Sequence, residues 1–240
     1  MAGFLNALKT FFAIHTPVLY QRTKRTVLSV ESVLRKSTPQ EIVFTRIYRG
    51  GGWGNEASVS GRGSTMQNTE SIRRELPTLL ERYKIGVLLD IPCGDFHWMK
   101  AVELGGTKYT GADIVKDLVD HNTRLFADDK RSFVHRDLMT GALPPADMIL
   151  CRDCLPHLPT EEILQALKNI RKSGITYLFT STYTDCTSNE DIVMGKFRRV
   201  NFQLHPFFFP SPILQINDSD GAYPDKCMAL WKVADLPVYS

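Results

Sequence analysis

Acidic residues recur where short apolar runs of the sequence end. Asp90 follows the run GVLL, Asp113 ends the run KYTGAD 23 residues later, and Asp137 follows the third run, which begins SFVH. A carboxylate about 20 residues beyond the first strand of a nucleotide-binding unit can accept hydrogen bonds from both hydroxyls of a ribose. Three such acids at successive strand ends predict a binding site for a nucleoside.

The turn LLDIPCGDF after the first run is a second sign of a ligand site. Gly94 has no Cβ, so the backbone can approach a ligand closely there. A helix expected over residues 95–104 would direct free N–H groups at the same space. The turn lacks the glycines of a dinucleotide fingerprint and the G-K-[ST] of a phosphate loop, which disfavours a nicotinamide dehydrogenase. Taken alone, the motif is also compatible with a plain strand-to-helix turn.

The segment CRDCLPHL after a fourth apolar run carries candidate catalytic groups. His157 is the candidate general base, because imidazole titrates near neutral pH. Asp153 could orient His157 or bind a divalent ion such as Mg²⁺. A histidine held between two prolines at a helix start is the structural alternative. Cys151 and Cys154 are interpreted as buried reduced thiols in preference to zinc ligands or a redox pair.

Strand and helix patterns alternate from residue 67 onward, as in a parallel sheet covered by helices on both faces. Strands are expected over 86–91, 108–113, 132–135, 147–151 and 177–183, and helices over 67–83, 95–104, 115–127 and 160–173. Segments 213–216 and 228–233 can pair as an antiparallel hairpin. The pattern predicts a Rossmann-like, doubly wound α/β fold whose ligands bind at the carboxyl ends of the strands.

The first 66 residues have a different character. Residues 1–45 predict one or two helices, and residues 46–66 contain six glycines with almost no periodicity. We therefore expect an N-terminal helical cap and a glycine-rich lid over 1–66, followed by a nucleoside-binding domain over 67–240. The apolar N-terminus lacks the basic start and cleavage site of a signal peptide. It could cap the domain or contact a membrane surface, backed by Arg22, Lys24 and Arg25.

Composition excludes several classes of protein. The chain has 240 residues, 43% hydrophobic and 23% charged, which is enough for a sizeable core. A net charge of +3 is too small to indicate a nucleic-acid partner. No apolar run reaches the length of a membrane span. Five cysteines, an odd number, disfavour a disulfide framework and indicate a reducing compartment such as the cytoplasm.

The region after the fifth predicted strand could line the site where a substrate binds. Arg198, Arg199, His205 and the aromatic run 207–209 combine charge with flat rings there. The alternative is a hydrophobic brace over the sheet edge. The acidic segment NDSDGAYPDK further on is interpreted as a turn, because it lacks the ligand spacing of a calcium loop.

The motifs LLDIPCGDF, YTGADIV, HRDL and ILCRDCLPHL together resemble the class I S-adenosylmethionine-dependent methyltransferases over about residues 86–233. The chain departs from that family's acid-x-Gly-x-Gly-x-Gly turn, where Pro92 and Phe96 replace the first and third glycines. The resemblance implies S-adenosylmethionine as cofactor. The cofactor contacts implied by position are Asp90, Pro92 and Gly94 at the methionine part, Asp113 and Ile114 at the ribose, Asp137 and Leu138 at the adenine edge, and Arg152 beneath the sulfonium.

The glycine-rich segment is similar to the leader of small bacterial methyltransferases associated with polysaccharide and glycolipid genes. That resemblance implies O-methylation of a sugar hydroxyl. Trp53 could stack on a sugar or adenine ring or anchor its loop, and Ser64 could bond the cofactor carboxylate or cap a helix. A methyltransferase for a small metabolite or a protein stays open, as does a catalytically silent nucleoside-binding module. The sequence does not indicate an oligomeric state.

Overall fold

The computed structural model describes residues 40–51, 53, 57–219 and 221–239. Its helices are α3 (Gln40–Arg49), α4 (Glu70–Arg82), α5 (Lys116–Phe126) and α6 (Thr160–Lys172). Its strands are β1 (Val87–Asp90), β2 (Lys108–Asp113), β3 (Arg131–His135), β4 (Met148–Cys151), β5 (Tyr177–Tyr183), β6 (Leu214–Asn217) and β7 (Lys226–Lys232). The predicted N-terminal helices, apart from α3, lie outside the described residues, and the division of the chain at residue 66 stays a prediction.

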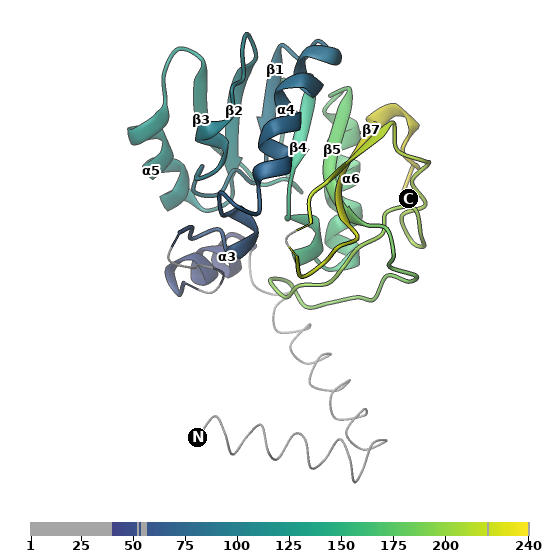
Figure 1. Cartoon of the computed structure of the whole chain (residues 1–240). Coiled ribbons are helices and arrows are strands. Elements are labelled where there is room, and N and C mark those ends of the chain that lie inside the picture. Colours follow the sequence, from purple (N-terminus) through teal and green to yellow (C-terminus); the bar gives the residue numbers. More distant parts are fainter. Residues whose placement is uncertain (1–39, 52, 54–56, 220, 240) are drawn as a thin grey trace, which may run out of the picture.

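The strands form one sheet in the order β3-β2-β1-β4-β5-β7-β6, shown in Figure 1. The first five are parallel, whereas β7 runs antiparallel between β5 and β6. The predicted doubly wound sheet with a C-terminal antiparallel hairpin is therefore confirmed. After β3 the chain crosses to β4, on the other side of β1, so β1 and β4 flank the switch point where ligands bind in such sheets.

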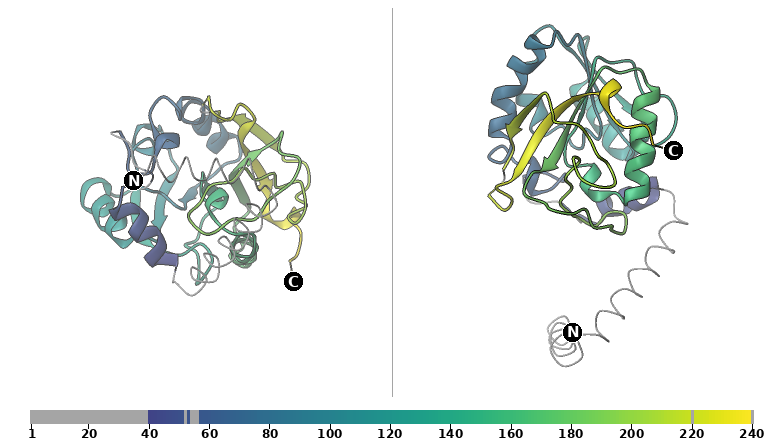
Figure 2. Two further views of the ribbon diagram at one scale, coloured as in Figure 1. Left: turned by 90° about the horizontal axis from the view of Figure 1, so that it is seen from below. Right: turned by 90° about the vertical axis from the view of Figure 1, so that its right-hand side faces the viewer.

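The two faces of the sheet carry separate cores because side chains alternate along each strand. Leu88 packs with the buried stripe of α4, while Leu89 packs with the buried stripe of α6. Figure 2 shows these two helices on opposite sides of the sheet. The stripe of α6 is formed by residues at helical spacing, namely Ile163, Ala166, Leu167 and Ile170.

The helix expected over residues 95–104 is wrong, since only a single 3₁₀ turn forms there, at Met99–Ala101. Gly94 and Phe96 both adopt left-handed backbone conformations, with φ of 53° and 56°, and an α-helix cannot pass through such residues. The ring of Phe96 instead enters the core, with its centroid 5.1 Å from those of Tyr109 and Phe133. The helix expected to begin at residue 95 therefore supplies no N-terminal N–H groups to the ligand side of this turn.

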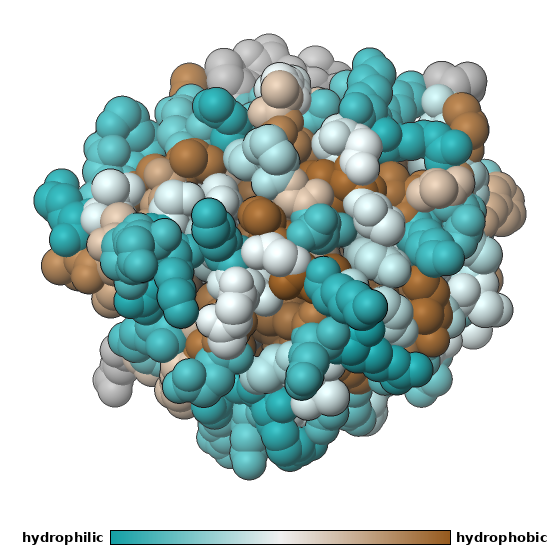
Figure 3. All heavy atoms as spheres, turned by 90° about the horizontal axis from the view of Figure 1, so that it is seen from above, coloured by the Kyte–Doolittle hydropathy of each residue, from teal (hydrophilic) through white to brown (hydrophobic). Residues whose placement is uncertain are grey.

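The ends of the sheet differ. α3, which extends four residues further than expected, lies below the carboxyl ends of the strands in Figure 1. The opposite end, at the amino ends, shows hydrophilic side chains around smaller hydrophobic patches (Figure 3). None of the helices in the described part of the chain is long and apolar enough to cross a membrane.

The packing of β2 gives a stability prediction. A Cβ added to Gly111 would stand 2.7 Å from Cδ1 of Phe133 and 3.0 Å from Cε1 of Tyr109, whereas one added to Gly106 meets nothing within 4 Å. We expect Gly111→Ala to lower the free energy of unfolding by about 1–3 kcal/mol through overpacking. Gly106→Ala, the matched control, should change it by less than about 1 kcal/mol. Urea denaturation measures both, and equal effects would contradict the packing described for β2.

Candidate active site

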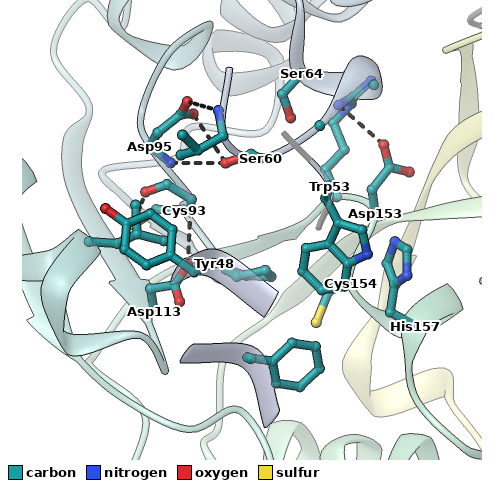
Figure 4. Close-up of a pocket in the computed structure, with 18 of the residues that line it drawn as sticks. Tyr48, Trp53, Ser60, Ser64, Cys93, Asp95, Asp113, Asp153, Cys154 and His157 are labelled. Atoms are coloured by element: carbon teal, nitrogen blue, oxygen red, sulfur yellow. Dashed lines mark hydrogen bonds and ion pairs between the residues drawn. The ribbon is translucent and has the colours of Figure 1, made fainter. Parts of the chain in front are cut away.

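A cavity of about 340 Å³ opens at the carboxyl ends of β1, β2 and β4, a volume typical of small-molecule sites. Its walls come from α3, the segment 57–64, the turn after β1, the end of β2, the segment 152–157 and the strands β5 and β7. Figure 4 shows Asp113, Cys93 and Asp95 on one side of this cavity and Asp153 and His157 on the other. We call these sides the Asp113 half and the His157 half.

Asp113 is the central group of the Asp113 half. It is only 4% exposed, and its two carboxylate oxygens accept the backbone N–H of Gly94 at 3.0 Å and of Val115 at 2.9 Å. Burial raises the pKa of Asp113 to about 6, against the lowering effect of these hydrogen bonds. A carboxylate has about four acceptor positions, so acceptor capacity remains for a ligand in the cavity.

Asp90 lies at the end of β1, on the neighbouring strand. Its carboxylate accepts the hydroxyl of Tyr109 at 2.7 Å, and the residue is 3% exposed. Burial raises the pKa of Asp90 to about 7, and the nearby charge of Asp113 adds to that rise. Two carboxylates that are costly to ionise thus stand side by side at this end of the sheet.

The His157 half contains a network of four charged side chains. Arg152 binds Asp218 through two hydrogen bonds, of 2.9 and 3.1 Å. The ammonium of Lys226 bridges Asp218 at 3.1 Å and Asp153 at 2.7 Å. Although burial raises it, the pKa of Asp153 is lowered overall by the charges of Lys226 and Arg152. Asp153 is therefore held ionised, and its partners are protein cations.

His157 lies beside this network but does not bond to Asp153. Its Nδ1 donates to the carbonyl oxygen of Lys196 at 3.1 Å, since a carbonyl only accepts. Nε2 therefore carries the lone pair. Burial lowers the pKa of His157, which favours the neutral ring. The orienting group expected at Asp153 is thus the Lys196 carbonyl instead.

Trp53 and Ser64 also line the cavity. The Trp53 ring centroid lies 4.7 Å from that of His157 and 5.7 Å from that of Phe44 on α3. Pro92 and Ile114 line the Asp113 half.

Two predicted site residues lie outside the wall of this cavity. Asp137 accepts the backbone N–H of Met139 and the hydroxyl of Thr140, both at 2.9 Å, and so holds its own turn. Leu138 packs in the core against α6.

The insertion after β5 acts mainly as a brace. Phe207 and Phe209 are buried in the core, and Arg198 is buried and bonded to the carbonyl of Leu158 and to Asp191. Phe197 is the aromatic residue of this stretch that reaches the cavity. All five cysteines are free thiols, and the described residues contain no group of three His, Cys, Asp or Glu that could hold a metal ion.

Several residues of the cavity wall and of the ion-pair network behind it escaped the sequence analysis. Asp218 belongs to the acidic segment interpreted as a turn, yet it is 1% exposed and binds Arg152. A lysine at the start of the apolar run KCMALW was the available signal for Lys226. Tyr183, Phe197 and Tyr223 form an aromatic group, with successive ring centroids 5.3–6.0 Å apart, and their distant positions in the sequence gave no signal.

Solved structures of other proteins share this fold. Human N-acetylserotonin methyltransferase in complex with S-adenosylmethionine aligns with 91% of this chain and 68% of its own, at 16% identity and a TM-score of 0.52. This is the class I methyltransferase fold. The same TM-score is found for magnesium protoporphyrin IX methyltransferase from Synechocystis with bound S-adenosylmethionine, which shares 15% identity over 81% of this chain and 97% of its own.

A third structure with this fold is 1,6-didemethyltoxoflavin-N1-methyltransferase from Burkholderia thailandensis, with bound 1,6-didemethyltoxoflavin and S-adenosylhomocysteine. It shares 14% identity over 80% of this chain and 86% of its own, with a TM-score of 0.52. No protein-family model and no curated protein sequence match the chain. At these identities the likeness establishes the fold, while the chemistry must be argued from the cavity.

The raised pKa of Asp90 gives a prediction on stability and pH. Because the folded state holds this proton up to about pH 7 and the unfolded state loses it near pH 4, wild-type stability falls as pH rises between these values. Asp90→Asn keeps an acceptor for Tyr109 and has no proton to lose.

We therefore expect Asp90→Asn to be more stable than the wild type at pH 8 by about 2–4 kcal/mol, with the difference vanishing near pH 4. Urea denaturation at both pH values measures it. Asp129→Asn, at an exposed position, serves as the control and should show no such pH-dependent gain. If the difference in the free energy of unfolding between Asp90→Asn and wild type is the same at both pH values, burial does not raise the pKa of Asp90.

Proposed function

We propose that this chain is an S-adenosylmethionine-dependent methyltransferase. The proposal rests on the buried Asp113 carboxylate at the carboxyl end of β2, which is fixed by the Gly94 and Val115 amides and faces a cavity of about 340 Å³. Support comes from the shared fold, because three proteins with it were solved with S-adenosylmethionine or S-adenosylhomocysteine bound.

The residues of the Asp113 half fit such a cofactor. Asp113 would accept the ribose hydroxyls, and the left-handed Gly94 brings the backbone to the cavity wall without a Cβ. Asp90 and Pro92 would line the methionine part, and Ile114 supplies apolar surface. Asp137 and Leu138 are left out of the proposed contacts because they do not line the cavity. When bound, S-adenosylmethionine supplies a methyl group activated by the adjacent sulfonium.

The His157 half fits an acceptor that gives up a hydroxyl proton. Nε2 of a neutral His157 can take that proton, because Nδ1 already donates to Lys196. Trp53, Phe197 and Tyr223 provide flat faces for a ring, and the cationic and anionic ends of Lys226 and Asp153 provide hydrogen bonds. This combination of flat faces and paired charges is suited to a neutral sugar, and we propose a sugar hydroxyl as the acceptor.

A small molecule other than a sugar is the second candidate acceptor. Proteins with the same fold are named for such acceptors, among them N-acetylserotonin and 1,6-didemethyltoxoflavin. The aromatic walls of the His157 half suit a planar ring as well. We also propose a reducing compartment, the cytoplasm, which five free cysteines support.

Calorimetric titration with S-adenosylhomocysteine, followed by a labelled-methyl transfer assay, tests the function. The assay uses neutral methyl glycosides, glycolipids and planar phenols as acceptors, each with and without EDTA. Binding together with transfer supports the methyltransferase. Binding without transfer to any acceptor supports a silent nucleoside-binding module, and the absence of binding contradicts the proposal.

Asp113→Asn tests the ribose contact. Loss of charge-assisted hydrogen bonds should weaken S-adenosylhomocysteine binding about 10–100-fold. Wild-type affinity should also fall as pH falls through about 6, because the carboxylate becomes protonated, whereas the variant's affinity should not follow this course. Calorimetry from pH 5 to 8 measures both effects. The loss of affinity caused by Asp113→Asn should be smaller for a 2′-deoxy analogue of S-adenosylhomocysteine. An equal loss with both ligands would argue against a ribose contact.

His157→Ala tests the base. Turnover should fall about 10²–10⁴-fold, the usual contribution of a general base, while affinity for S-adenosylhomocysteine stays unchanged. In the wild type, kcat/KM should decline toward acid with a pKa below that of an ordinary histidine, because burial lowers the pKa of His157. His157→Gln keeps much of the side-chain volume without a base and should be equally slow. Wild-type turnover in either variant removes His157 from the mechanism.

A further inference from the structure

The segment 57–64 is tied to the turn after β1 by one carboxylate. Oδ2 of Asp95 accepts the hydroxyl of Ser58 at 2.8 Å and the backbone N–H of Val59 at 3.0 Å, and Oδ1 accepts the hydroxyl of Ser60 at 3.1 Å. In return, the backbone N–H of Asp95 donates to the Ser60 oxygen at 3.1 Å. These bonds join residues 35–37 positions apart in the sequence, so they fix one segment against another.

The turn leaves no spare room at this junction. A Cβ added to Gly94 would stand 2.2 Å from Oγ of Ser60, so the serine occupies the space that a side chain at position 94 would need. The amide of Gly94 also donates to Asp113. Residues 94 and 95 therefore join the proposed ribose acceptor to the segment 57–64 through consecutive peptide units.

The same segment reaches across to the His157 half. A Cβ added to Gly61 would stand 2.7 Å from the carbonyl oxygen of Trp53, and one added to Gly63 would stand 3.0 Å from Oδ2 of Asp153. The Trp53 ring in turn lies 4.7 Å from that of His157. Figure 4 shows Ser60 beside Asp95 at one end of this bridge and Trp53 beside His157 at the other.

We propose that Asp95 is a positioning residue for the proposed methyl transfer. Its carboxylate holds residues 58–60, and this segment in turn fixes Trp53 over His157. Asp95 thereby couples the two halves of the cavity. The inference rests on the proposed function for its consequence in catalysis, whereas the contact between Asp95 and the segment stands on the geometry alone.

In the ligand-free full chain, Asp95→Ala should release the segment 57–64 from the turn after β1. Trypsin cleavage after Arg62, located by mass spectrometry, should become at least 10-fold faster than in the wild type. His157 should then lose the cover of Trp53 and become hydrated, so its pKa, measured by NMR, should rise toward that of an ordinary histidine. Asp153, Lys226 and the Lys196 carbonyl face His157 in both proteins and serve as a constant background. Affinity for S-adenosylhomocysteine should fall at least 10-fold.

Matched variants separate positioning from general damage. Asp129→Ala removes an exposed carboxylate and should leave all three readouts unchanged. Asp95→Asn retains one acceptor oxygen and should lie between Asp95→Ala and wild type. Should Asp95→Ala fail to fold, Ser60→Ala, which removes one partner of the carboxylate, should still raise both the cleavage rate and the pKa of His157.

A folded Asp95→Ala with wild-type cleavage and a wild-type His157 pKa would overturn the proposal. A wild-type protein that does not bind S-adenosylhomocysteine, together with a segment released by Asp95→Ala, would overturn the proposed function while supporting the positioning contact. The two failures are thus distinguishable.

Discussion

The geometry of the cavity depends on the hydrogen bond from the Gly94 amide to the buried Asp113 carboxylate. This bond joins the turn after β1 to the tip of β2, the two parallel strands that form the Asp113 half. It requires a left-handed Gly94 that points its amide inward, and the left-handed Phe96 then turns the chain into the core. A helix beginning at residue 95 is incompatible with this path. The segment 57–64 can dock on the turn because Gly94 leaves room for Ser60.

The His157 half is held together by ion pairs between buried charged side chains. Burying four charged groups is costly unless each is paired, and Arg152, Asp218, Lys226 and Asp153 pair in a chain that leaves no net charge. The network joins the segment after β4 to the C-terminal hairpin, which supplies Asp218 and Lys226. The hairpin thereby contributes to the cavity as well as closing the sheet, and removing one partner would leave an unpaired buried charge.

Local patterns predicted the elements well where burial is regular. The apolar strands and the stripe of α6 follow from periodicity, and the strand ends placed Asp90 and Asp113 at one edge because parallel strands share their carboxyl ends. Asp137, the third acid expected there, holds its own turn outside the cavity wall. The turn at residues 94–96 could not be predicted, since nothing local shows that Phe96 would accept a left-handed conformation to bury its ring. The bonds from Asp95 to residues 58–60 and from Lys226 to Asp153 join positions at least 35 residues apart in the sequence, so only the folded chain reveals them.

Three of the cavity carboxylates, Asp90, Asp113 and Asp153, differ in their pKa values because of their surroundings, although the residue type is the same. Burial raises the pKa values of Asp90 and Asp113, whereas Lys226 and Arg152 lower that of Asp153. Among the described residues, neither Asp90 nor Asp113 has an ion-pair partner, although the charge of Arg152 acts on Asp90 from a distance. Their negative charge would stabilise a cationic ligand. A sulfonium bound there would in turn favour their ionised forms, so ligand binding near neutral pH would release protons. The His157 half is already neutral, which suits an uncharged acceptor whose proton leaves through a neutral imidazole.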